Sequence, residues 1–480
     1  MGRHGSGEDQ GSSTPTLVTA TPRILILDGG VSTHLEHLLQ QREQREQQHE
    51  SVKTGGKDAS NDMIRDVPSN GLFRYRELWS SSLLVSAALR RHQQQHDAHH
   101  NNTTDIDKDL AIVRQGHLDW CHAGANILST VTYQCHYQSE LWPRVSTTHD
   151  HHVRDSSSSS TSKPLLTDDA CMDDMWTIAL EQVHRAMHEY QSQQQHQQSV
   201  TNTPKRSLWI AASSGCFGAA LANGAEYTGD YGAYQSMDTL ETFHRRKIHR
   251  ILQLESDVDA IALETVPSIL ECKAIRNVLN NLAVHQVHTT NDNAQVVPST
   301  IAFWVSLACR NGGELNDGSH IQDVLHSLLP INGAENQIAD IEDPLVGIGL
   351  NCCDSQYLPS LVSILVKHLI DCWIHKSQTD LQAASRIPAI IVYPNSGEEW
   401  DATTSSWKEG TGCTSAADFA DRLMGVIKDI EDLFQAEQIE RNRLIPLPTI
   451  VVGGCCRTSP AAISELRDRI DRHLQKDTSS

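Results

Sequence analysis

Two pairs of adjacent cysteines stand out among the residues whose types and spacing could do chemistry. Cys352-Cys353 follows one apolar run, and Cys455-Cys456 follows two glycines at the end of another. Neighbours on an extended strand point to opposite faces, so only one thiol of the first pair is needed at a site. Three cysteine thiolates with an open fourth position are typical of a catalytic zinc site. The pattern therefore favours one zinc ion bound by thiols of both pairs.

Other interpretations of the cysteines remain open. Cys455 and Cys456 could form a reversible disulfide in a thiol redox protein, although a reducing compartment disfavours one. They also precede a helix predicted to begin at Ser459 and Pro460, whose N-terminus would favour thiolate. A lone cysteine is usually buried, inert packing. We assign that role to Cys121, Cys135, Cys171, Cys272, Cys309, Cys372 and Cys413.

Eight short apolar runs rich in β-branched residues could position these groups. They are residues 24–27, 126–132, 208–212, 260–263, 301–307, 346–350, 389–392 and 449–452. Each is bounded by Gly, Pro, Asn or Ser, as buried parallel strands are. Helix-like segments such as residues 110–122 and 419–433 separate them. Eight such units predict the α/β class with a single (β/α)8 TIM barrel, whereas the alternative, an open doubly wound sheet, rarely needs eight.

Low-complexity polar segments interrupt this pattern. They lie near residues 41–70, 91–108, 147–163, 191–205 and 284–298. Gln, His, Ser, Asn and Asp dominate them, and such segments cannot bury enough apolar area to offset chain entropy. We therefore expect a disordered N-terminal tail over residues 1–21 and one barrel over residues 22–476, with these segments as disordered loop insertions.

The charge balance bears on partners and location. The 480 residues carry 39 Lys and Arg against 60 Asp and Glu, a net charge of −21, and no basic block. These features argue against a nucleic-acid partner. The most apolar stretch, residues 358–374, contains Lys367 and Asp371 and is interpreted as an amphipathic helix rather than a membrane span. With no export signal found, we expect a cytoplasmic protein; the sequence does not indicate its oligomeric state.

Polar side chains follow most of the predicted strands. Asp28 and Glu264 come directly after the first and fourth runs, and Asn395 follows the seventh. In a (β/α)8 barrel, reactive residues lie at the carboxyl ends of the strands. Asp28 could be a mere turn residue and Glu264 a solvated charge, but this placement favours a function for both.

The motifs at these positions resemble those of the homocysteine S-methyltransferase family, in family order from Arg23 to about Leu474. They are Asp28-Gly29-Gly30, Leu78-Trp79-Ser80, His117-Leu118-Asp119-Trp120, Ala123-Gly124-Ala125-Asn126, Thr132-Tyr133-Gln134, Gly224-Ala225-Glu226-Tyr227-Thr228-Gly229-Asp230-Tyr231, Glu264-Thr265-Val266-Pro267, Gly349-Leu350-Asn351-Cys352, Val392-Tyr393-Pro394-Asn395-Ser396-Gly397-Glu398 and Gly453-Gly454-Cys455-Cys456-Arg457-Thr458. One departure lies at residues 213–218, where the family's usual Pro and Tyr are replaced by Cys216 and Phe217.

The resemblance implies a zinc-dependent methyltransferase with a (β/α)8 fold and one Zn²⁺ per chain. By this resemblance the zinc ligands are Cys352, Cys455 and Cys456. The nucleophile would be the zinc-activated thiolate of the substrate homocysteine, with no nucleophile from the protein.

The resemblance also implies substrate contacts. Asp28 and Glu264 match the acidic residues that bind the amino group of homocysteine, and Asn395 is a further substrate-binding candidate within its motif. The Tyr-Pro-Asn-Ser-Gly-Glu motif resembles the branch that uses S-methylmethionine, with S-adenosylmethionine as a second sulfonium donor. The product is methionine, so the role would be methionine biosynthesis.

A sulfonium cation can be held by aromatic faces and acidic groups. Tyr227, Trp304 and Tyr393 are the aromatic candidates, and packing in the core is the plain alternative for each. Two other functions remain open. One is the same fold using another donor such as betaine, and the other is a non-catalytic zinc or thiol protein that acts by binding a partner.

Overall fold

A computed structural model describes most of the chain. The described residues are 23–53, 81, 83–85, 87–88, 91, 104–137, 169–201, 206–253, 258–288, 301–331, 343–379, 386–397, 400–401, 406–407, 411–413 and 415–477. The expected N-terminal tail over residues 1–21, the insertion at 147–163 and the Leu78-Trp79-Ser80 motif lie outside them, as does most of the insertions at 41–70, 91–108 and 284–298.

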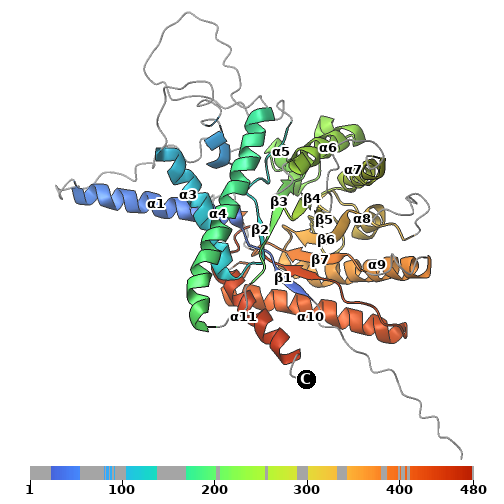
Figure 1. Cartoon of the computed structure of the whole chain (residues 1–480). Coiled ribbons are helices and arrows are strands. Elements are labelled where there is room, and N and C mark those ends of the chain that lie inside the picture. Colours follow the sequence, from blue (N-terminus) through green and yellow to red (C-terminus); the bar gives the residue numbers. More distant parts are fainter. Residues whose placement is uncertain are drawn as a thin grey trace, which may run out of the picture.

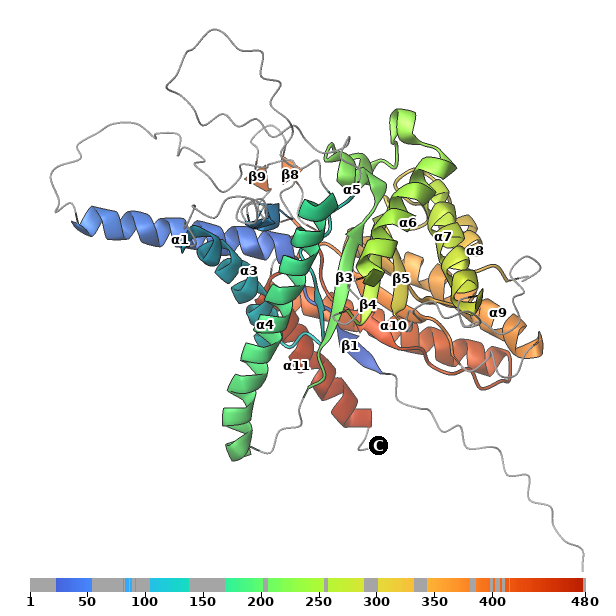
Figure 2. The ribbon, with the colours of Figure 1, turned by 45° about the horizontal axis from the view of Figure 1, so that its top comes forward.

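Eight parallel strands form the centre of the molecule, as the sequence predicts (Figures 1 and 2). They are β1 (Ile24–Ile26), β2 (Ile127–Ser129), β3 (Trp209–Gly215), β4 (Ala260–Val266), β5 (Ala302–Leu307), β6 (Leu345–Asn351), β7 (Ala389–Tyr393) and β10 (Ile450–Val452). Their order in the sheet is β1-β10-β7-β6-β5-β4-β3-β2. Each predicted run therefore contains or overlaps one strand.

The sheet closes where β1 meets β2. Leu27 and Ile127 form an isolated parallel bridge. The backbone N–H of Asn126 donates to the carbonyl of Ile26 at 2.6 Å, and that of Asp28 donates to the carbonyl of Ile127 at 3.0 Å. This contact between the two edge strands makes the fold a (β/α)8 barrel and excludes the open doubly wound sheet.

Helices surround the strands and alternate with them along the chain (Figure 1). They are α1 (Val31–Lys53), α3 (Thr104–Ala123), α4 (Asp169–Thr201), α5 (Phe217–Leu221), α6 (Met237–Gln253), α7 (Ile269–His288), α8 (Ile321–Leu328), α9 (Leu358–Thr379), α10 (Ala416–Glu440) and α11 (Pro460–Asp477). A separate antiparallel pair, β8 (Trp400–Asp401) and β9 (Ser406–Trp407), lies in the connection after β7.

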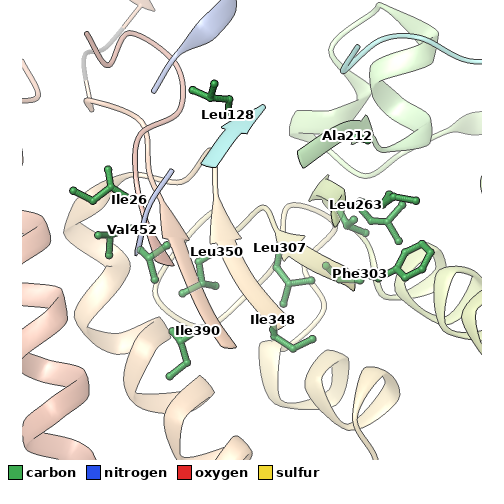
Figure 3. Packing of buried hydrophobic residues seen from close by; sticks show 14 of the residues in the cluster. Ile26, Leu128, Ala212, Leu263, Phe303, Leu307, Ile348, Leu350, Ile390 and Val452 are labelled. Carbon is green, nitrogen blue, oxygen red and sulfur yellow. The ribbon is translucent and has the colours of Figure 1, made fainter. Parts of the chain in front are cut away.

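The strands bury side chains on both faces. The larger cluster packs the outward strand residues, such as Ile348 and Ile390, against the helices (Figure 3). A smaller cluster fills the barrel interior with inward residues such as Ala262, Trp304 and Val451. Burial on both faces explains the continuous apolar runs in the sequence.

Helix α9 matches the amphipathic helix predicted near residues 358–374. The segment Ser355–Gln378 is the one described helix that is long and apolar enough to cross a membrane, and 56% of its most apolar window is buried. Leu361, Leu365 and Leu369 are fully buried in the barrel's main core. Its apolar face is therefore covered by the barrel.

The expected insertions are helical where they are described, and α3 and α7 include residues 104–108 and 284–288 of two of them. Helix α1 continues through residues 41–53 and α4 through residues 191–201, whereas the sequence analysis expects disordered loops there. Gln, Glu, Arg and Lys have high helix propensity, so a helix anchored by its apolar start can extend into a polar segment. Arg42, for example, lies 4.0 Å from Glu46 one turn later.

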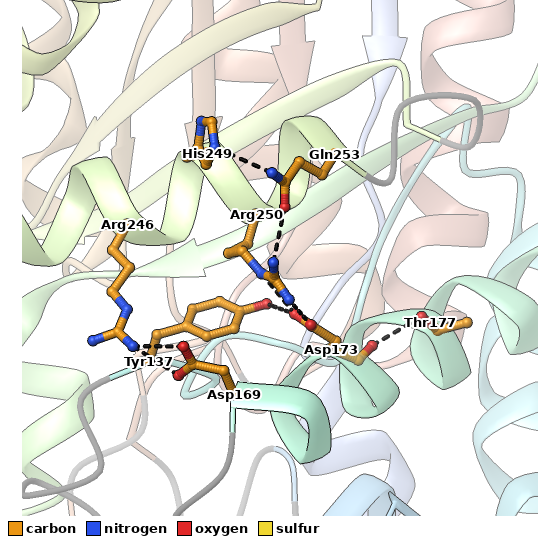
Figure 4. A network of polar contacts seen from close by, with 8 residues as sticks. All are labelled: Tyr137, Asp169, Asp173, Thr177, Arg246, His249, Arg250 and Gln253. Atoms are coloured by element: carbon orange, nitrogen blue, oxygen red, sulfur yellow. Dashed lines mark hydrogen bonds and ion pairs between the residues drawn. The ribbon is translucent and has the colours of Figure 1, made fainter.

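Polar contacts join the start of α4 to α6 (Figure 4). Arg246 pairs with Asp169 at 2.6 Å, and the Nε of Arg250 donates to Asp173 at 2.9 Å. Tyr137 also donates to Asp173, at 2.8 Å. The four charged side chains are about a third to a half exposed, so these ion pairs contribute little to stability and serve mainly to position α4.

Gly349 on β6 offers a test of the packing inside the barrel. A Cβ at this position would lie 2.8 Å from the carbonyl oxygen of Ile391 on β7. We expect Gly349→Ala to lower the free energy of unfolding by about 1–3 kcal/mol through this overpacking. The control Gly425→Ala, on α10 with open space around it, should raise it by about 0.5–1 kcal/mol. Chemical denaturation measures both, and equal effects of the two substitutions would contradict this packing.

Candidate metal and substrate site

One cavity lies at the carboxyl ends of the strands. It opens to solvent, and its empty space is about 780 Å³ when the solvent at its mouth is included. Its polar lining combines thiols, carboxylates, hydroxyls and one amide. These side chains belong to Asp28, Ser32, Thr33, Ser129, Thr130, Tyr133, Ser213, Glu226, Tyr227, Glu264, Thr265, Asn351, Cys352, Tyr393, Cys455 and Cys456. Asp28 and Cys456, which are 428 residues apart in the chain, therefore line the same cavity, as barrel topology predicts.

Three thiols converge on one wall of this cavity. The Sγ atoms of Cys352, Cys455 and Cys456 all lie within 4.8 Å of one another. Four-coordinate zinc, with Zn–S bonds of about 2.3 Å, places its sulfur ligands about 3.8 Å apart. All three residues are partly exposed to the cavity, so an open coordination position would face it. The donor set fits a catalytic metal site, and Cys353 is buried in the core, which leaves one thiol of the first pair at the site.

The thiol cluster also has the electrostatics of a cation site. Hydrogen bonds from Cys352 and Cys455 lower the pKa of Cys456 well below its ordinary value. Hydrogen bonding to Cys455 and Cys456 raises the pKa of Cys352. One of the three thiols therefore ionises readily, and ionisation of the other two needs a cation between the sulfurs.

The two glycines before the cysteine pair allow a close approach of two chain segments. A Cβ on Gly453 would lie 2.7 Å from the carbonyl oxygen of Asp28, and one on Gly454 would collide with the side chain of Thr458. The N–H of Gly454 donates to the carbonyl of Asp28 at 3.0 Å. The Gly-Gly sequence thus brings the thiols to the strand end that carries Asp28.

Asn395 holds the same loop from the other side. Its side-chain oxygen accepts a hydrogen bond from the backbone N–H of Cys456 at 3.2 Å, and its own N–H donates to the carbonyl of Cys353 at 3.1 Å. The residues that line the cavity do not include it. The structure therefore gives Asn395 a role in placing Cys456, and contact with substrate stays a prediction.

Cys352 and Thr265 are held in an unusual backbone conformation. Thr265 has a φ of 61° and Cys352 a φ of 49°, in the left-handed region that β-branched residues rarely adopt. The side chain of Asn351 joins them, because its oxygen accepts from the N–H of Thr265 at 2.9 Å and its amide donates to the Thr265 hydroxyl at 2.8 Å. Strain of this kind is typical of functional sites, and here it turns both strand ends toward the cavity.

Asp28 and Glu264 face the cavity from different strands. Asp28 accepts hydrogen bonds from the N–H of Ser129 at 2.6 Å and from its hydroxyl at 3.0 Å. Burial raises the pKa of Asp28, the bonds from Ser129 oppose this, and the charge of Glu264 adds to it. Burial also raises the pKa of Glu264, which accepts hydrogen bonds from the hydroxyls of Ser213 and Tyr393. Two carboxylates that destabilise each other in one cavity form a site for a cationic group.

The structure places the three aromatic candidates differently. Tyr227 and Tyr393 line the cavity, but Trp304 does not and is buried in the barrel interior. Glu226 also lines the cavity, although the sequence indicates it only as part of a motif. The feature that could have identified it is an acidic residue next to an aromatic one in a loop bounded by glycines.

The other cysteines behave largely as predicted. The residues that are buried are Cys121, Cys135, Cys171, Cys272, Cys309 and Cys372. Cys413 is only partly buried. Burial raises the pKa of Cys135 to about 12, so that thiol stays neutral. This confirms the packing role for six of the seven.

The departure at residues 213–218 places Phe217 in a buried aromatic cluster and not in the lining of the cavity. Phe217 is fully buried and lies 5.3 Å from Tyr231 and 5.1 Å from Phe243, measured between ring centroids. Its N–H donates to the buried carboxylate of Glu271 at 2.6 Å. Phe217 therefore anchors this loop by its packing and by its backbone hydrogen bond.

Comparison with known proteins gives one consistent family. The homocysteine S-methyltransferase family profile matches residues 25–470. Homocysteine S-methyltransferase 2 of Zea mays is 26% identical over 76% of this chain and 81% of its own length. Selenocysteine Se-methyltransferase of Brassica oleracea var. italica is 27% identical over 75% of this chain and 79% of its own. The match covers every described strand except the first residue of β1.

Solved structures show the same fold. The crystal structure of the homocysteine methyltransferase MmuM from Escherichia coli, in its oxidized form, superposes with a TM-score of 0.51 at 22% identity. The superposition covers 93% of this chain and 96% of that one. At this identity the likeness supports the barrel fold.

Proposed function

We propose that this chain, which belongs to the homocysteine S-methyltransferase family, transfers a methyl group from a sulfonium donor to the thiolate of homocysteine and gives methionine. One zinc ion bound by Cys352, Cys455 and Cys456 is part of this proposal. The observation that carries it is the single cavity in which this thiol cluster faces Asp28 and Glu264. A non-catalytic zinc protein would not need that pair of carboxylates beside the metal ligands.

The acceptor amino acid has a complementary place in this cavity. Its ammonium group would lie between Asp28 and Glu264, whose buried negative charges it neutralises. Its carboxylate would lie at the N-terminus of α1, where Val31, Ser32 and Thr33 line the cavity. Backbone N–H groups at a helix N-terminus favour an anion. Both ends of an α-amino acid are thereby recognised, and its thiol is directed toward the cysteine cluster.

The metal ion would supply one chemical effect, which is to lower the pKa of the bound homocysteine thiol so that thiolate is present at neutral pH. In the reaction, the sulfur of homocysteine forms a bond to the methyl carbon as the bond from that carbon to the sulfonium sulfur breaks. The electron pair of the broken bond returns to the donor, which leaves as a neutral thioether. The thiol proton passes to solvent, so no residue needs to protonate a leaving group. Asp28, Glu264 and the end of α1 contribute by orienting the acceptor.

The charge of the cavity favours a cationic donor. Among the described residues that line it, Asp28, Glu226 and Glu264 are acidic and none is Lys, Arg or His. Three thiolates and Zn²⁺ together carry a net charge of about −1. S-methylmethionine and S-adenosylmethionine each have a net positive charge, whereas betaine is a zwitterion with no net charge. We therefore assign the sulfonium compounds as donors.

A donor panel tests this proposal. With zinc-loaded protein and homocysteine, we expect methionine formation from S-methylmethionine, with S-adenosylmethionine as a second donor. Betaine should give a kcat/KM at least about 100-fold lower, since it lacks the net positive charge that the acidic cavity favours. Chromatography of methionine measures all three rates. Turnover of betaine in the absence of turnover of either sulfonium would overturn the donor assignment.

A further inference from the structure

The geometry points to Glu226, on the loop after β3, as the group that binds the positive charge of the methyl donor, with the ring of Tyr227 beside it. This inference rests on the proposed function and assigns a third carboxylate of the cavity, separate from the two that receive the acceptor's ammonium group.

The backbone at Glu226 is held in place. A single 3-10 turn spans Ala225–Tyr227 and begins after Gly224, which has a φ of 83°. The side-chain amide of Asn316, in the loop between β5 and α8, donates to the carbonyl of Glu226 at 2.8 Å. On the opposite side, a Cβ on Gly218 of α5 would lie 2.5 Å from the N–H nitrogen of Glu226. The loop is thus packed against two elements, which hold the backbone of Glu226 in place.

One oxygen of the Glu226 carboxylate is buried without a hydrogen-bond donor, although the residue as a whole is only partly buried. Its Oε2 atom is inaccessible to solvent and has no hydrogen-bond partner among the described residues. Glu264 and Asp28, in contrast, accept two hydrogen bonds each from the protein. A buried carboxylate oxygen that lacks a donor is costly unless a bound cation or donor completes it.

The surroundings of Glu226 fit a cation close to the reacting sulfur. Glu226 lies close enough to Cys456 for their negative charges to repel each other. Both groups line the same cavity. A sulfonium donor must bring its methyl carbon to the acceptor sulfur at this cluster, and its positive charge would then lie between Cys456 and Glu226.

Tyr227 supplies an aromatic surface next to this carboxylate. Its side chain is 58% exposed although it lines the cavity, which is unusual for so large an apolar ring. A cation over a tyrosine ring is stabilised by the charge distribution of the ring. Glu226 and Tyr227 together therefore form a subsite with the two features that a sulfonium or quaternary cation prefers.

The test compares Glu226→Gln with Asp230→Asn, which removes an exposed carboxylate four residues later in the same loop. We expect Glu226→Gln to raise the KM for S-methylmethionine by about 10- to 100-fold, with the KM for homocysteine and the zinc content unchanged. Asp230→Asn should leave all three values as in the wild type. Tyr227→Ala should also raise the donor KM, and Tyr227→Phe should restore it.

A binding measurement separates the two proposals. Calorimetric titration of zinc-loaded protein should show that the wild type binds S-methylmethionine more tightly than uncharged methionine, and that Glu226→Gln loses at least about 10-fold of this preference. A wild type that turns over and binds the sulfonium, with Glu226→Gln unchanged, overturns this inference alone. A wild type that neither binds nor turns over either sulfonium overturns the proposed function and this inference together.

Discussion

Replacing Cys455 with serine is expected to remove both the bound zinc and the activity. The three Sγ atoms of the cluster lie within 4.8 Å of one another, so each thiol is needed to complete one coordination sphere. Loss of a thiolate weakens the site and leaves the homocysteine thiol, with an ordinary pKa of about 8.5, only a few per cent ionised at neutral pH. We expect kcat/KM to fall by at least about 10³-fold, because positioning of the thiolate is lost as well. Zinc analysis and the methionine assay measure the two effects.

The matched control is Cys413→Ser, which removes a partly buried thiol that does not line the cavity. It should keep one zinc per chain and wild-type turnover. A redox function makes the opposite prediction, namely a reversible Cys455–Cys456 disulfide detected by alkylation and mass spectrometry. Full activity of Cys455→Ser would exclude the thiol cluster as the metal site.

Asp28→Asn is expected to have the second largest effect on activity. It should lower the affinity for homocysteine but stabilise the substrate-free protein. The substitution removes one of the two carboxylates proposed to bind the acceptor's ammonium group. We expect kcat/KM for homocysteine to fall by about 10²–10³-fold, mainly through KM, as for the loss of one partner of a buried ion pair. The KM for S-methylmethionine should change much less.

The stability of Asp28→Asn follows from the direction of the pKa shift. Burial raises the pKa of Asp28 in the folded protein, so the ionised carboxylate destabilises the fold at pH values above that pKa. The substrate-free variant should therefore unfold at a higher temperature than the wild type at neutral pH. This advantage should shrink as the pH falls through the raised pKa, because the wild type then becomes neutral as well.

Asp259→Asn is the control for this substitution. Asp259 also accepts a hydrogen bond from the backbone of a neighbouring strand, from the N–H of Ile210 at 2.7 Å, but it precedes β4 and lies at the other end of the barrel. It should leave the KM for homocysteine unchanged. Equal losses of homocysteine affinity in the two variants would show that Asp28 has no specific role in binding the acceptor.

The strands and the thiol cluster could be predicted from the sequence because the local pattern and the barrel topology determine them. Each apolar run is long enough for a buried strand, and the carboxyl ends of parallel strands meet at one face. The position of Cys352 beside Cys455 and Cys456 follows from this rule once the strands are counted. The helical continuation of α1 through residues 41–53 was not predicted, since composition alone does not separate a polar helix from a polar loop.

The finer features of the site depend on contacts that no local pattern encodes. The left-handed conformation of Thr265 is imposed by Asn351, which lies 86 residues later in the chain. The contact of Asn395 with Cys456 depends on how two loops pack, and the sequence motif alone placed this residue among the substrate contacts. Glu226 becomes a candidate only when one of its carboxylate oxygens is seen buried without a donor and the residue is seen to line the cavity. The predicted cytoplasmic location stays a prediction.

The central claim is that the homocysteine sulfur joins three cysteine sulfurs at one zinc ion. X-ray absorption spectroscopy at the zinc edge of the zinc-loaded protein tests it most directly. We predict three sulfur ligands and one lighter ligand without substrate, and four sulfur ligands after homocysteine is added. If the number of sulfur ligands stayed the same after homocysteine was added to catalytically active protein, this claim would be contradicted.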